Sequence, residues 1–488
     1  MKKIILYILF PLLSFGQTQI GSDIDGETAG DQSGYSVSLS GDGSTLAIGS
    51  PYSDANGDSS GSVRVYKNVS GIWTQIGADI DGDSTHDLCG WSVSLSNDGS
   101  ILAIGVVDNN VTGSNSGSVR VYQNVSGIWI QIGSDIDGDS NYDFNGYSVS
   151  LSSDGSTLAI GIYGRDGNGV DSGSVRVYKN ISGIWTKIGT DINGEATEDY
   201  SGVSVSLSSD GSIVAIGASQ NDGNGLNSGS VRVYQNISGN WTQIGIDIDG
   251  EAIEDYSGIS VSLSSDGNTL AIGAYGNDGN GENSGSVRVY KNVSGTWTKI
   301  GTDIDGEAAY DFNGYSVSLS ADGNVVAIGA YLNDANGNDS GSVRLFKNIS
   351  GNWIKIGFSI NGEIINDNSG FSISLSSDGA SLGIGAPNND GNGTSSGHVR
   401  VYDFSAVLSS DSFVLANFSV YPNPASEFVN INLEEGLILE KVNVYNTLGQ
   451  LVKTENKNSI AVSPLAKGSY FFEVITNKGK AAKQILVQ

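Results

Sequence analysis

The chain has 488 residues, a hydrophobic fraction of 38%, 69 Gly and only 6 Pro, so it can form a packed core and is neither collagen-like nor disordered. Its net charge of −29 argues against nucleic-acid binding, because phosphate groups are bound by Lys and Arg. One Cys and two His exclude a disulfide framework and a Cys/His zinc cluster.

The first part of the chain, residues 1–16, has the pattern of a secretory signal peptide. Two Lys precede an apolar run, residues 4–13, and the small residues Ser14 and Gly16 follow. A transmembrane helix needs about 20 apolar residues, so this run is too short, and no later segment could span a membrane as a helix. We expect cleavage near Gly16, which leaves Gln17 as the first residue; the alternative is a buried N-terminal strand.

A motif of seven residues, Gly-x-Ser-[Val/Ile]-Ser-Leu-Ser, recurs through the rest of the chain. Its copies follow one another at a constant spacing of 56 residues, without insertion or deletion. They begin at Gly34, Gly90, Gly146, Gly202, Gly258, Gly314 and Gly370. The first repeat contains four short runs, residues 36–40, 46–49, 62–66 and 73–80, which alternate or are β-branched and end at Gly, Asn or Asp. This pattern predicts four strands in each repeat.

Seven repeats of four antiparallel strands predict an all-β chain that folds as a seven-bladed β-propeller. The alternative is a β-solenoid, whose coils are usually much shorter. The seventh repeat stops after its third strand, residues 398–404, but residues 18–26 match residues 74–82, a fourth strand. We therefore expect the N-terminal strand to complete the last blade and close the ring, which removes exposed strand edges.

The acidic excess lies in residues 17–405, because residues 406–488 contain as many Lys as Asp and Glu together. Two kinds of connection are acidic. We call the connection from a fourth strand to the next first strand an inter-repeat loop, and the connection from a second to a third strand an intra-repeat loop. Since strands alternate in direction, both kinds emerge on one face of the ring. The sequence predicts that this face carries a crown of carboxylates.

The inter-repeat loops have carboxylates at relative positions 1, 3, 5 and 9, a spacing with which a loop can wrap calcium in oxygen ligands. The candidate ligands are Asp79, Asp81, Asp83, Asp87, Asp247, Asp249, Glu251, Asp255, Asp303, Asp305, Glu307 and Asp311. These loops have Gly at position 4, as at Gly82, whereas calcium loops of this kind have it at position 6. The alternative is that the acids form turns and caps and pair with buried Arg. Calcium is the one cofactor that the sequence leaves open.

One Arg lies in the middle of each predicted third strand. These residues are Arg64, Arg120, Arg176, Arg232, Arg288, Arg344 and Arg400. A third strand is flanked by neighbouring blades, and a buried cation needs a carboxylate. We expect a structural role, with an Asp of the inter-repeat loop as partner; the alternative is that the Arg side chains hold a ligand.

Six Trp residues start the predicted fourth strand. They are Trp73, Trp129, Trp185, Trp241, Trp297 and Trp353. Repeated aromatic residues can stack on sugars, but in a propeller they more often fill the edge of a blade. We expect the second role.

The segments Ser33-Gly34 and Ala47-Ile48-Gly49-Ser50-Pro51, and their counterparts around Gly370 and Pro387, resemble FG-GAP repeats. Such repeats build the propeller of integrin α-subunits and of many bacterial surface proteins, and the resemblance covers about residues 18–405. The Phe of the name-giving "FG" is replaced in all repeats, by Ser33, Cys89, Asn145, Ser201, Ser257, Asn313 and Ser369. In the integrin type, calcium binds a long acidic loop between the first two strands. Here that loop is only residues 41–43, so the resemblance does not bring calcium with it.

Beyond a linker, residues 406–416, the 56-residue period ends and a second domain, residues 417–488, is predicted. Short strands separated by turns favour a small β-sandwich. Its segments 421–424 (YPNP), 444–452 (VYN-x-x-G-Q-x-V) and 465–470 (L-x-x-G-x-Y) and its basic last strand resemble the C-terminal sorting domain of the Bacteroidetes type IX secretion system. The resemblance implies passage through the periplasm and outer membrane, and removal of the tail with surface attachment or release. The alternative is an Ig-like binding module.

These observations predict a secreted or cell-surface binding and adhesion protein that is not an enzyme. Its expected partners are the type IX machinery, through residues 417–488, and an extracellular protein or glycan. Seven nearly identical blades leave no unique set of catalytic residues, and His86 and His398 stand in unrelated contexts. The alternatives are an accessory or catalytic propeller of polysaccharide degradation and a structural surface-layer protein.

Overall fold

The computed structural model describes residues 17–408, 414–415, 417–434, 436–447, 450–477 and 479–488. The predicted signal peptide, residues 1–16, and part of the predicted linker lie outside the described residues. The chain divides into two compact units. The larger, the propeller unit, comprises Gln19–Lys355 and Ser359–Tyr402, and the smaller contains Asp403–Gln488, which begins with helix α1 (Ser405–Leu408).

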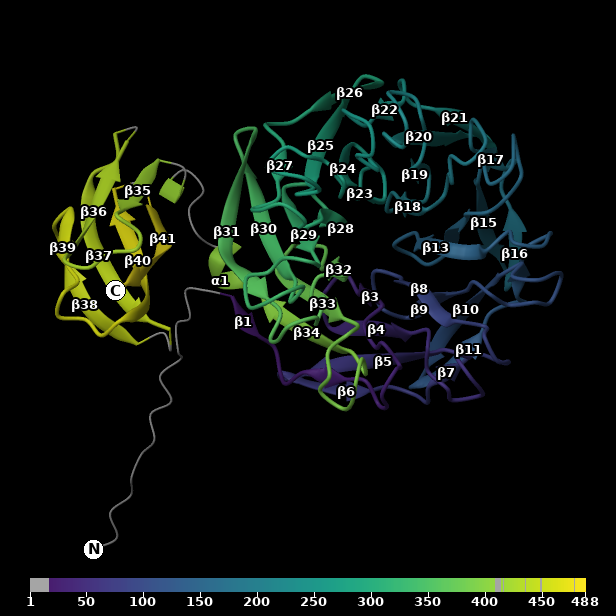
Figure 1. The fold of residues 1–488 in the computed structure, drawn as a ribbon, viewed down its shortest axis with the longest axis horizontal. Coiled ribbons are helices and arrows are strands. Elements are labelled where there is room, and N and C mark those ends of the chain that lie inside the picture. The colour runs from purple at the N-terminus through teal and green to yellow at the C-terminus, as the bar shows by residue number, and fades with distance from the viewer. Residues whose placement is uncertain (1–16, 409–413, 416, 435, 448–449, 478) are drawn as a thin grey trace, which may run out of the picture. The chain divides into compact units, whose positions relative to one another are not determined.

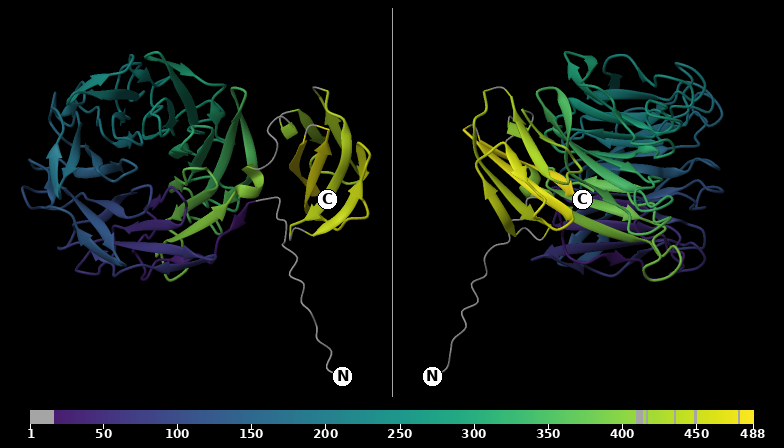
Figure 2. Two further views of the ribbon diagram at one scale, coloured as in Figure 1. Left: turned by 180° about the vertical axis from the view of Figure 1, so that it is seen from behind. Right: turned by 60° about the vertical axis from the view of Figure 1, so that its left-hand side comes forward.

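The repeats of the propeller unit form antiparallel sheets arranged around a common axis (Figure 1, Figure 2). The first repeat contains β3 (Ser36–Leu39), β4 (Thr45–Ser50), β5 (Ser62–Val69), β6 (Ile72–Gln75) and β7 (Ile80–Asp81). The second contains β8 (Cys89–Leu95), β9 (Ile101–Val106), β10 (Ser118–Val125), β11 (Ile128–Gln131) and β12 (Ile136–Asp137). The third contains β13 (Asn145–Leu151), β14 (Thr157–Ile162), β15 (Ser174–Ile181), β16 (Ile184–Lys187) and β17 (Ile192–Asn193).

The remaining repeats follow the same order of elements. The fourth contains β18 (Ser204–Leu207), β19 (Ile213–Ala218), β20 (Ser230–Ile237), β21 (Asn240–Gln243) and β22 (Ile248–Asp249). The fifth contains β23 (Ser260–Leu263), β24 (Thr269–Ala274), β25 (Ser286–Val293), β26 (Thr296–Lys299) and β27 (Ile304–Asp305). The sixth contains β28 (Asn313–Leu319), β29 (Val325–Ala330), β30 (Ser342–Ile349) and β31 (Asn352–Asn361). The seventh contains β32 (Ser372–Leu375), β33 (Ser381–Ala386) and β34 (His398–Asp403), joined by β1 (Thr18–Gln19) and β2 (Ile24–Asp25). The predicted all-β propeller is confirmed.

The fourth strand of a repeat differs from the prediction of one continuous run, residues 73–80. In the first repeat it is divided into β6 and β7, both of which pair with β5. Between them Gly77 has a φ of 82°, a conformation that glycine adopts readily and that turns the backbone away from the extended form. In the sixth repeat the corresponding strand, β31, is continuous although Gly357, at the position of Gly77, has a φ of 65°, so the glycine conformation alone does not decide where the strand divides.

The outer strand of the seventh sheet comes from the start of the described chain (Figure 1). Ile24 of β2 pairs with Val399 of β34, and the N–H of Ile20 donates to the carbonyl of Val401 at 2.7 Å. Ile24 is buried in a hydrophobic cluster that also contains Ile48 of the first repeat. The N-terminal segment thus occupies the place of the fourth strand that the seventh repeat lacks.

The Ser residues of the repeated motif join neighbouring sheets. The hydroxyl of Ser36 donates to the carbonyl of Gly90 in the next repeat at 2.8 Å. The equivalent bond is present at every junction between repeats, and at the last junction Ser372 donates to Gly34 at 2.7 Å. The second Ser of each motif accepts from the N–H of a Leu in an adjacent repeat. Each bond contributes about 1 kcal/mol. The Ser residues of the motif therefore stabilise the packing of one sheet against the next.

The repeated Trp residues join the sheets at their outer edge. The indole Nε1 of Trp129 donates to the carbonyl of Ile76 in the preceding repeat at 3.0 Å, and the other five make the same bond. Each ring is half-buried against the core of the neighbouring sheet. This geometry agrees with an edge-filling role.

The turn after each first strand lies on the face opposite the inter-repeat and intra-repeat loops. An Asp side chain stabilises it by hydrogen bonds. The Asp42 carboxylate accepts hydrogen bonds from the hydroxyls of Ser40 and Ser44. Although partial burial opposes ionisation, these hydrogen bonds lower the pKa of Asp42 to about 2, and the pKa of Asp154 in the third repeat is lowered to about 2 in the same way. The pKa values of Asp98, Asp210, Asp266 and Asp322 are also lowered.

These turns predict how stability depends on pH. A carboxyl whose pKa is lowered by folding contributes stability above its unfolded pKa of about 4 and loses that contribution as pH falls through its folded value. We expect Asp154→Asn to destabilise the propeller near pH 6 and to have a progressively smaller effect as pH falls from 4 to 2. Chemical denaturation of the variant and of the parent at a series of pH values measures this difference. A cost that stays constant over that range would contradict the assignment.

The smaller unit contains two antiparallel sheets. One consists of β35 (Phe418–Tyr421), β36 (Phe428–Leu433) and β39 (Ser459–Ala461), and the other of β38 (Leu451–Glu455), β37 (Leu439–Asn446), β40 (Gly468–Thr476) and β41 (Gly479–Val487). Alternate apolar residues of both sheets, such as Val429, Ile431, Val442 and Val444, are almost fully buried. The predicted C-terminal β-sheet domain is confirmed, and it has a hydrophobic core of its own.

Candidate ligand-binding face

The inter-repeat and intra-repeat loops lie together on one face of the propeller unit. Asn56 of an intra-repeat loop donates from Nδ2 to the carbonyl of Gly82 in the following inter-repeat loop at 2.9 Å. Equivalent bonds join Asn168 to Gly194 and Asn280 to Gly306. We call this side of the propeller the acidic face, because it carries the loops that are rich in Asp and Glu.

Aromatic residues gather on the acidic face around a central cavity. The cavity has a volume of about 290 Å³, and residues from the first strand of each repeat line it. The innermost aromatic residues are Tyr35, Trp91, Tyr147, Tyr315 and Phe371, and the fourth and fifth repeats have Val203 and Ile259 at this position. The circle of aromatic residues around the cavity is therefore interrupted at the fourth and fifth repeats.

A second row of rings from the loops extends this group into one network of ring contacts. The two rows together, which we call the aromatic collar, are Tyr35, Tyr52, Trp91, Phe144, Tyr147, Tyr163, Tyr200, Tyr256, Tyr275, Phe312, Tyr315, Tyr331 and Phe371. Tyr163 stacks on Tyr147 and on Tyr200, with 4.4 Å between ring centroids in both pairs. All members of the collar are half-buried, so each presents part of its ring to solvent.

Several collar residues have an unfavourable backbone conformation. Phe144, Tyr200, Tyr256 and Phe312 all have φ values between 50° and 52°. Bulky residues rarely adopt the left-handed region, and each such residue costs about 1–3 kcal/mol. The loop holds them there by backbone hydrogen bonds, such as that from the N–H of Tyr200 to the carbonyl of Asp171. Gln32, Leu88 and Asn368 have φ values of 51–55° at the same position, so this conformation belongs to the inter-repeat loop of every repeat.

Sequence reasoning missed the collar and considered only the outer Trp residues as ligand platforms. The signal was present, because five of the seven repeats have an aromatic residue directly after the Gly of the motif. Burial raises the pKa of Tyr35, Tyr147, Tyr163 and Tyr315 above the ordinary value, so these hydroxyls of the collar stay protonated. They can therefore donate hydrogen bonds but do not act as bases.

Near the collar, the predicted calcium ligands of the loop between the first and second repeats occupy different positions and do not share a site. Asp87 is buried and accepts from the backbone N–H groups of Asp83 and Ser84. Asp83 binds Arg120, Asp79 accepts from Gln75, and Asp81 belongs to β7.

The eight other candidates show the same division of roles. Asp255 and Asp311 accept from backbone N–H groups, Asp249 and Asp305 lie in short strands, and Glu251 and Glu307 approach Arg288 and Arg344. Asp247 accepts from Gln243 and Asp303 from Lys299. Within the described ranges, no three of the twelve bring their oxygen atoms within 4.8 Å of one another. The geometry favours the role of turn and cap over calcium binding.

The seven strand Arg residues are all buried, with 3–7% of their surface exposed. Arg120 and Arg176 bind Asp side chains directly, Arg120 with Nε 3.0 Å from Asp135 and Nη2 2.6 Å from Asp83. The predicted Asp partner does not hold for the other five. Arg64, Arg232, Arg288, Arg344 and Arg400 donate to backbone carbonyls, and their nearest carboxylate is a Glu at 3.6–3.8 Å. The longer Glu side chain reaches the guanidinium from the same loop position as Asp83.

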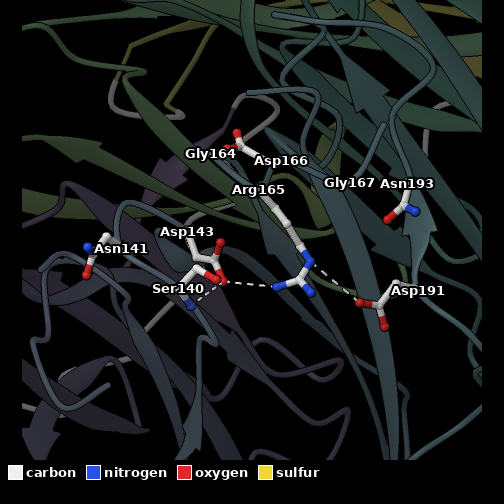
Figure 3. Close-up of a pocket in the computed structure, with 9 residues that line it drawn as sticks. All are labelled: Ser140, Asn141, Asp143, Gly164, Arg165, Asp166, Gly167, Asp191 and Asn193. Atoms are coloured by element: carbon white, nitrogen blue, oxygen red, sulfur yellow. Dashed lines mark hydrogen bonds and ion pairs between the residues drawn. The ribbon is translucent and has the colours of Figure 1, made fainter. Parts of the chain in front are cut away.

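Another cavity on this face, of about 310 Å³, contains an Arg outside the third strands (Figure 3). Arg165 projects between loop carboxylates, with Nη1 3.0 Å from Asp143 and 3.1 Å from Asp139, and Nε 3.6 Å from Asp191. The other repeats have Ser or Asn at its position. Arg165 therefore places a positive charge of the protein itself next to these three carboxylates.

Comparisons with known families support both parts of the chain. Residues 22–66, 193–234, 246–290 and 302–346 match the FG-GAP repeat, and residues 419–488 match the secretion system C-terminal sorting domain. Both predicted resemblances are confirmed. The chain carries FG-GAP repeats and a type IX sorting domain, which indicates export and a secreted or cell-surface location.

The solved structures to which this chain is similar include two lactonases and a β-propeller domain. The periplasmic gluconolactonase PpgL of Pseudomonas aeruginosa is 19% identical, with a TM-score of 0.47 over 68% of this chain and 85% of that chain. A putative 6-phosphogluconolactonase of Bacteroides uniformis is 12% identical, with a TM-score of 0.49 over 68% and 86%. The Cps50 (Swd1) β-propeller domain of Myceliophteria thermophila is 12% identical, with a TM-score of 0.49 over 79% and 99%. No curated protein matches the chain. In the described part of the chain, no helix is long and apolar enough to cross a membrane.

Proposed function

We propose that this exported protein is a non-catalytic binding protein and that its extracellular partner docks on the aromatic collar. The observation that carries the proposal is the continuous network of half-exposed rings on the acidic face. Large aromatic patches that remain exposed on a folded protein mark interaction sites. Rings held against one another lose little conformational freedom on binding, so they are efficient contact residues.

The surroundings of the collar favour a protein partner with a basic surface. Protein interfaces typically combine an aromatic centre, which supplies most of the binding energy, with a polar rim. Here the rim consists of loop carboxylates such as Asp54, Asp166 and Asp278. Complementary charge accelerates association and disfavours acidic partners. A polyanion is therefore a poor candidate.

The chemistry of the collar supports binding rather than catalysis. Its titratable groups are tyrosine hydroxyls, and burial raises the pKa values of Tyr35, Tyr163 and Tyr315, so these three are not activated as nucleophiles or bases. The single Cys, Cys89, is buried, and burial raises its pKa to about 12. Many of the loop carboxylates are engaged by Arg, Lys, Gln or backbone N–H groups.

Replacement of collar residues is expected to weaken binding while the fold is kept. Tyr147→Val and Tyr163→Ser introduce residues that the fourth repeat has at the same positions, Val203 and Ser219. We expect the double variant to bind its partner at least tenfold more weakly, because aromatic contacts at an interface centre are each worth about 2 kcal/mol. Pull-down from extracellular and surface fractions of the host, followed by affinity measurement with the recovered partner, tests this.

A matched control replaces an exposed apolar residue away from the collar. Ile130→Thr changes a half-exposed residue of the outer strand β11 to the Thr found in the first and third repeats, and we expect unchanged binding. A glycan array with the same variants distinguishes the other functions. Collar-dependent glycan binding would change the class of partner, product release would indicate an enzyme, and self-assembly without a partner would indicate a surface-layer role.

A further inference from the structure

The seventh repeat differs from the others at the first residue of its third strand. This residue is His398 of β34, and the six other repeats have Ser there: Ser62, Ser118, Ser174, Ser230, Ser286 and Ser342. His398 pairs with Asp25 of β2, so it lies where the N-terminal segment completes the last sheet. One of only two His in the chain is thus placed at the junction that joins the two ends of the propeller.

Two carboxylates approach the imidazole of His398. Its Nδ1 lies 3.8 Å from Oδ2 of Asp23, in the N-terminal segment, and 3.9 Å from Oε2 of Glu363, in the inter-repeat loop before the seventh repeat. The three ligand atoms lie within 4.8 Å of one another. Among the residues that the structure describes, no other three His, Cys, Asp or Glu side chains meet this condition.

The imidazole is buried and turns Nδ1 towards the two carboxylates. His398 is 1% exposed, and Nε2 has no hydrogen-bond partner among the described residues. The two carboxylate oxygens are too far from Nδ1 for a hydrogen bond, which needs about 3.2 Å or less. Nε2 lies on the opposite side of the ring from these carboxylates, and the hydroxyls at the same position in five other repeats, those of Ser62, Ser118, Ser174, Ser230 and Ser286, also lack a partner among the described residues. The observation that points to a ligand is therefore Nδ1, which faces two carboxylate oxygens without bonding to either.

The carboxylates keep one oxygen each for such a ligand. Oδ1 of Asp23 accepts from Gln19 at 2.6 Å, and Oε1 of Glu363 lies 3.7 Å from Nη1 of Arg400. These contacts orient the side chains and leave Oδ2 and Oε2 directed towards His398. The side chains of Asp23 and Glu363 are 30% and 45% exposed, so an ion can enter from solvent.

We infer that His398, Asp23 and Glu363 bind a divalent transition-metal ion, with Zn²⁺ as the best match. One imidazole nitrogen and two carboxylate oxygens form a normal zinc donor set, and water can supply the fourth ligand. Ligand atoms around a tetrahedral zinc are about 3.4 Å apart, so the two distances to Nδ1, 3.8 and 3.9 Å, need to contract by about half an ångström, and the two carboxylate oxygens, within 4.8 Å of one another, also need to lie at that separation. Calcium and magnesium prefer sites made of oxygen alone.

The ion would add a link between three segments that are already joined by packing, by strand pairing and by the contacts of Arg400 with Glu363 and Asn361. Asp23 belongs to the N-terminal segment, His398 to β34, and Glu363 to the loop that precedes the seventh repeat. Because a metal that binds only the folded state stabilises it, zinc should raise the melting temperature of the propeller.

The test uses the full chain, purified without a histidine tag and treated with a chelator. We expect competition titration of Zn²⁺ against a chromophoric chelator to show one equivalent bound. His398→Ser, which restores the residue of the other repeats, should weaken binding at least roughly tenfold, and Asp23→Asn should do the same. His86→Ser is the matched control: His86 is the other His, its side chain is 64% exposed, and its replacement should leave the affinity unchanged.

A second measurement separates the site from adventitious binding. Zinc should raise the melting temperature of the parent and of His86→Ser but not of His398→Ser, and Co²⁺ should give the absorption of a tetrahedral site in the same two proteins. Less than one equivalent of zinc, equal affinity in His398→Ser, or loss of binding in His86→Ser would overturn the inference. If His398→Ser does not fold, the Asp23→Asn result decides by the same criteria.

Discussion

A chain that lacks residues 17–26 is expected to unfold at a clearly lower temperature than a chain that begins at Gln17. The deletion removes β1 and β2 and leaves the edge of β34 without a partner. It also removes Ile24, which is 6% exposed, and the carbonyl of Ile20 that accepts from Nε1 of Trp73 at 2.9 Å. Loss of a buried Ile costs about 2–5 kcal/mol and each hydrogen bond about 1 kcal/mol, so the total exceeds about 5 kcal/mol.

For a propeller of this size, that cost corresponds to a fall in melting temperature of roughly 5 °C or more. Differential scanning calorimetry of the two chains measures it. A synthetic peptide with the sequence of residues 17–26, added to the shortened chain, should restore part of the loss, whereas a peptide with Ile20 and Ile24 replaced by Ser should not. Equal melting temperatures of the full and shortened chains would show that the N-terminal segment contributes nothing to ring closure.

Removal of residues 406–488 is expected to abolish export while the propeller still folds. These residues include the matched sorting domain, 419–488, and their sheets have a separate hydrophobic core with Val429, Val442 and Phe472 almost fully buried. The propeller core is built from residues of its own repeats. In the native host, the shortened protein should reach the periplasm, because the predicted signal peptide is retained, and should accumulate there.

Cell fractionation followed by immunoblotting locates the protein. The reciprocal experiment fuses residues 406–488 to an unrelated folded reporter with a signal peptide, and this reporter should appear outside the cell. Val444→Asp in the fused tail is the control, because a charge at a residue with no exposed surface should unfold the domain and stop export. Tail-less protein at normal levels in the medium or on the surface would refute the assignment.

The propeller and the sorting domain were predictable because their signals are local and repeated. Polar and apolar residues alternate over Ser36–Ser40, which is typical of a strand with one buried face. The same segment recurs at the same spacing in seven copies, so the strand assigned in one repeat supports the assignment in the others. The pairing of the N-terminal segment with the last sheet followed from a count of strands, since residues 18–26 supply the strand that the seventh repeat lacks. The division of the fourth strand into β6 and β7 was harder, because the same run is divided in the first repeat and continuous in the sixth.

The candidate sites depend on distances between residues far apart in the chain, and only the packing of the sheets decides these. Tyr147, Tyr163 and Tyr200 belong to a first strand, an intra-repeat loop and an inter-repeat loop, and they form one stack because the ends of neighbouring sheets converge on the cavity. The spacing of Asp79 to Asp87 suggested a metal loop, but Asp87 points inward to cap its own turn.

Asp23 and His398 lie at opposite ends of the repeats, and although the count of strands placed their segments side by side, it did not show which side chains would meet. Composition and periodicity determine which strands form, because alternation and turn residues act over a few positions. Which side chains meet is decided by ring closure, because it brings the first and last segments of the propeller within 3.8 Å.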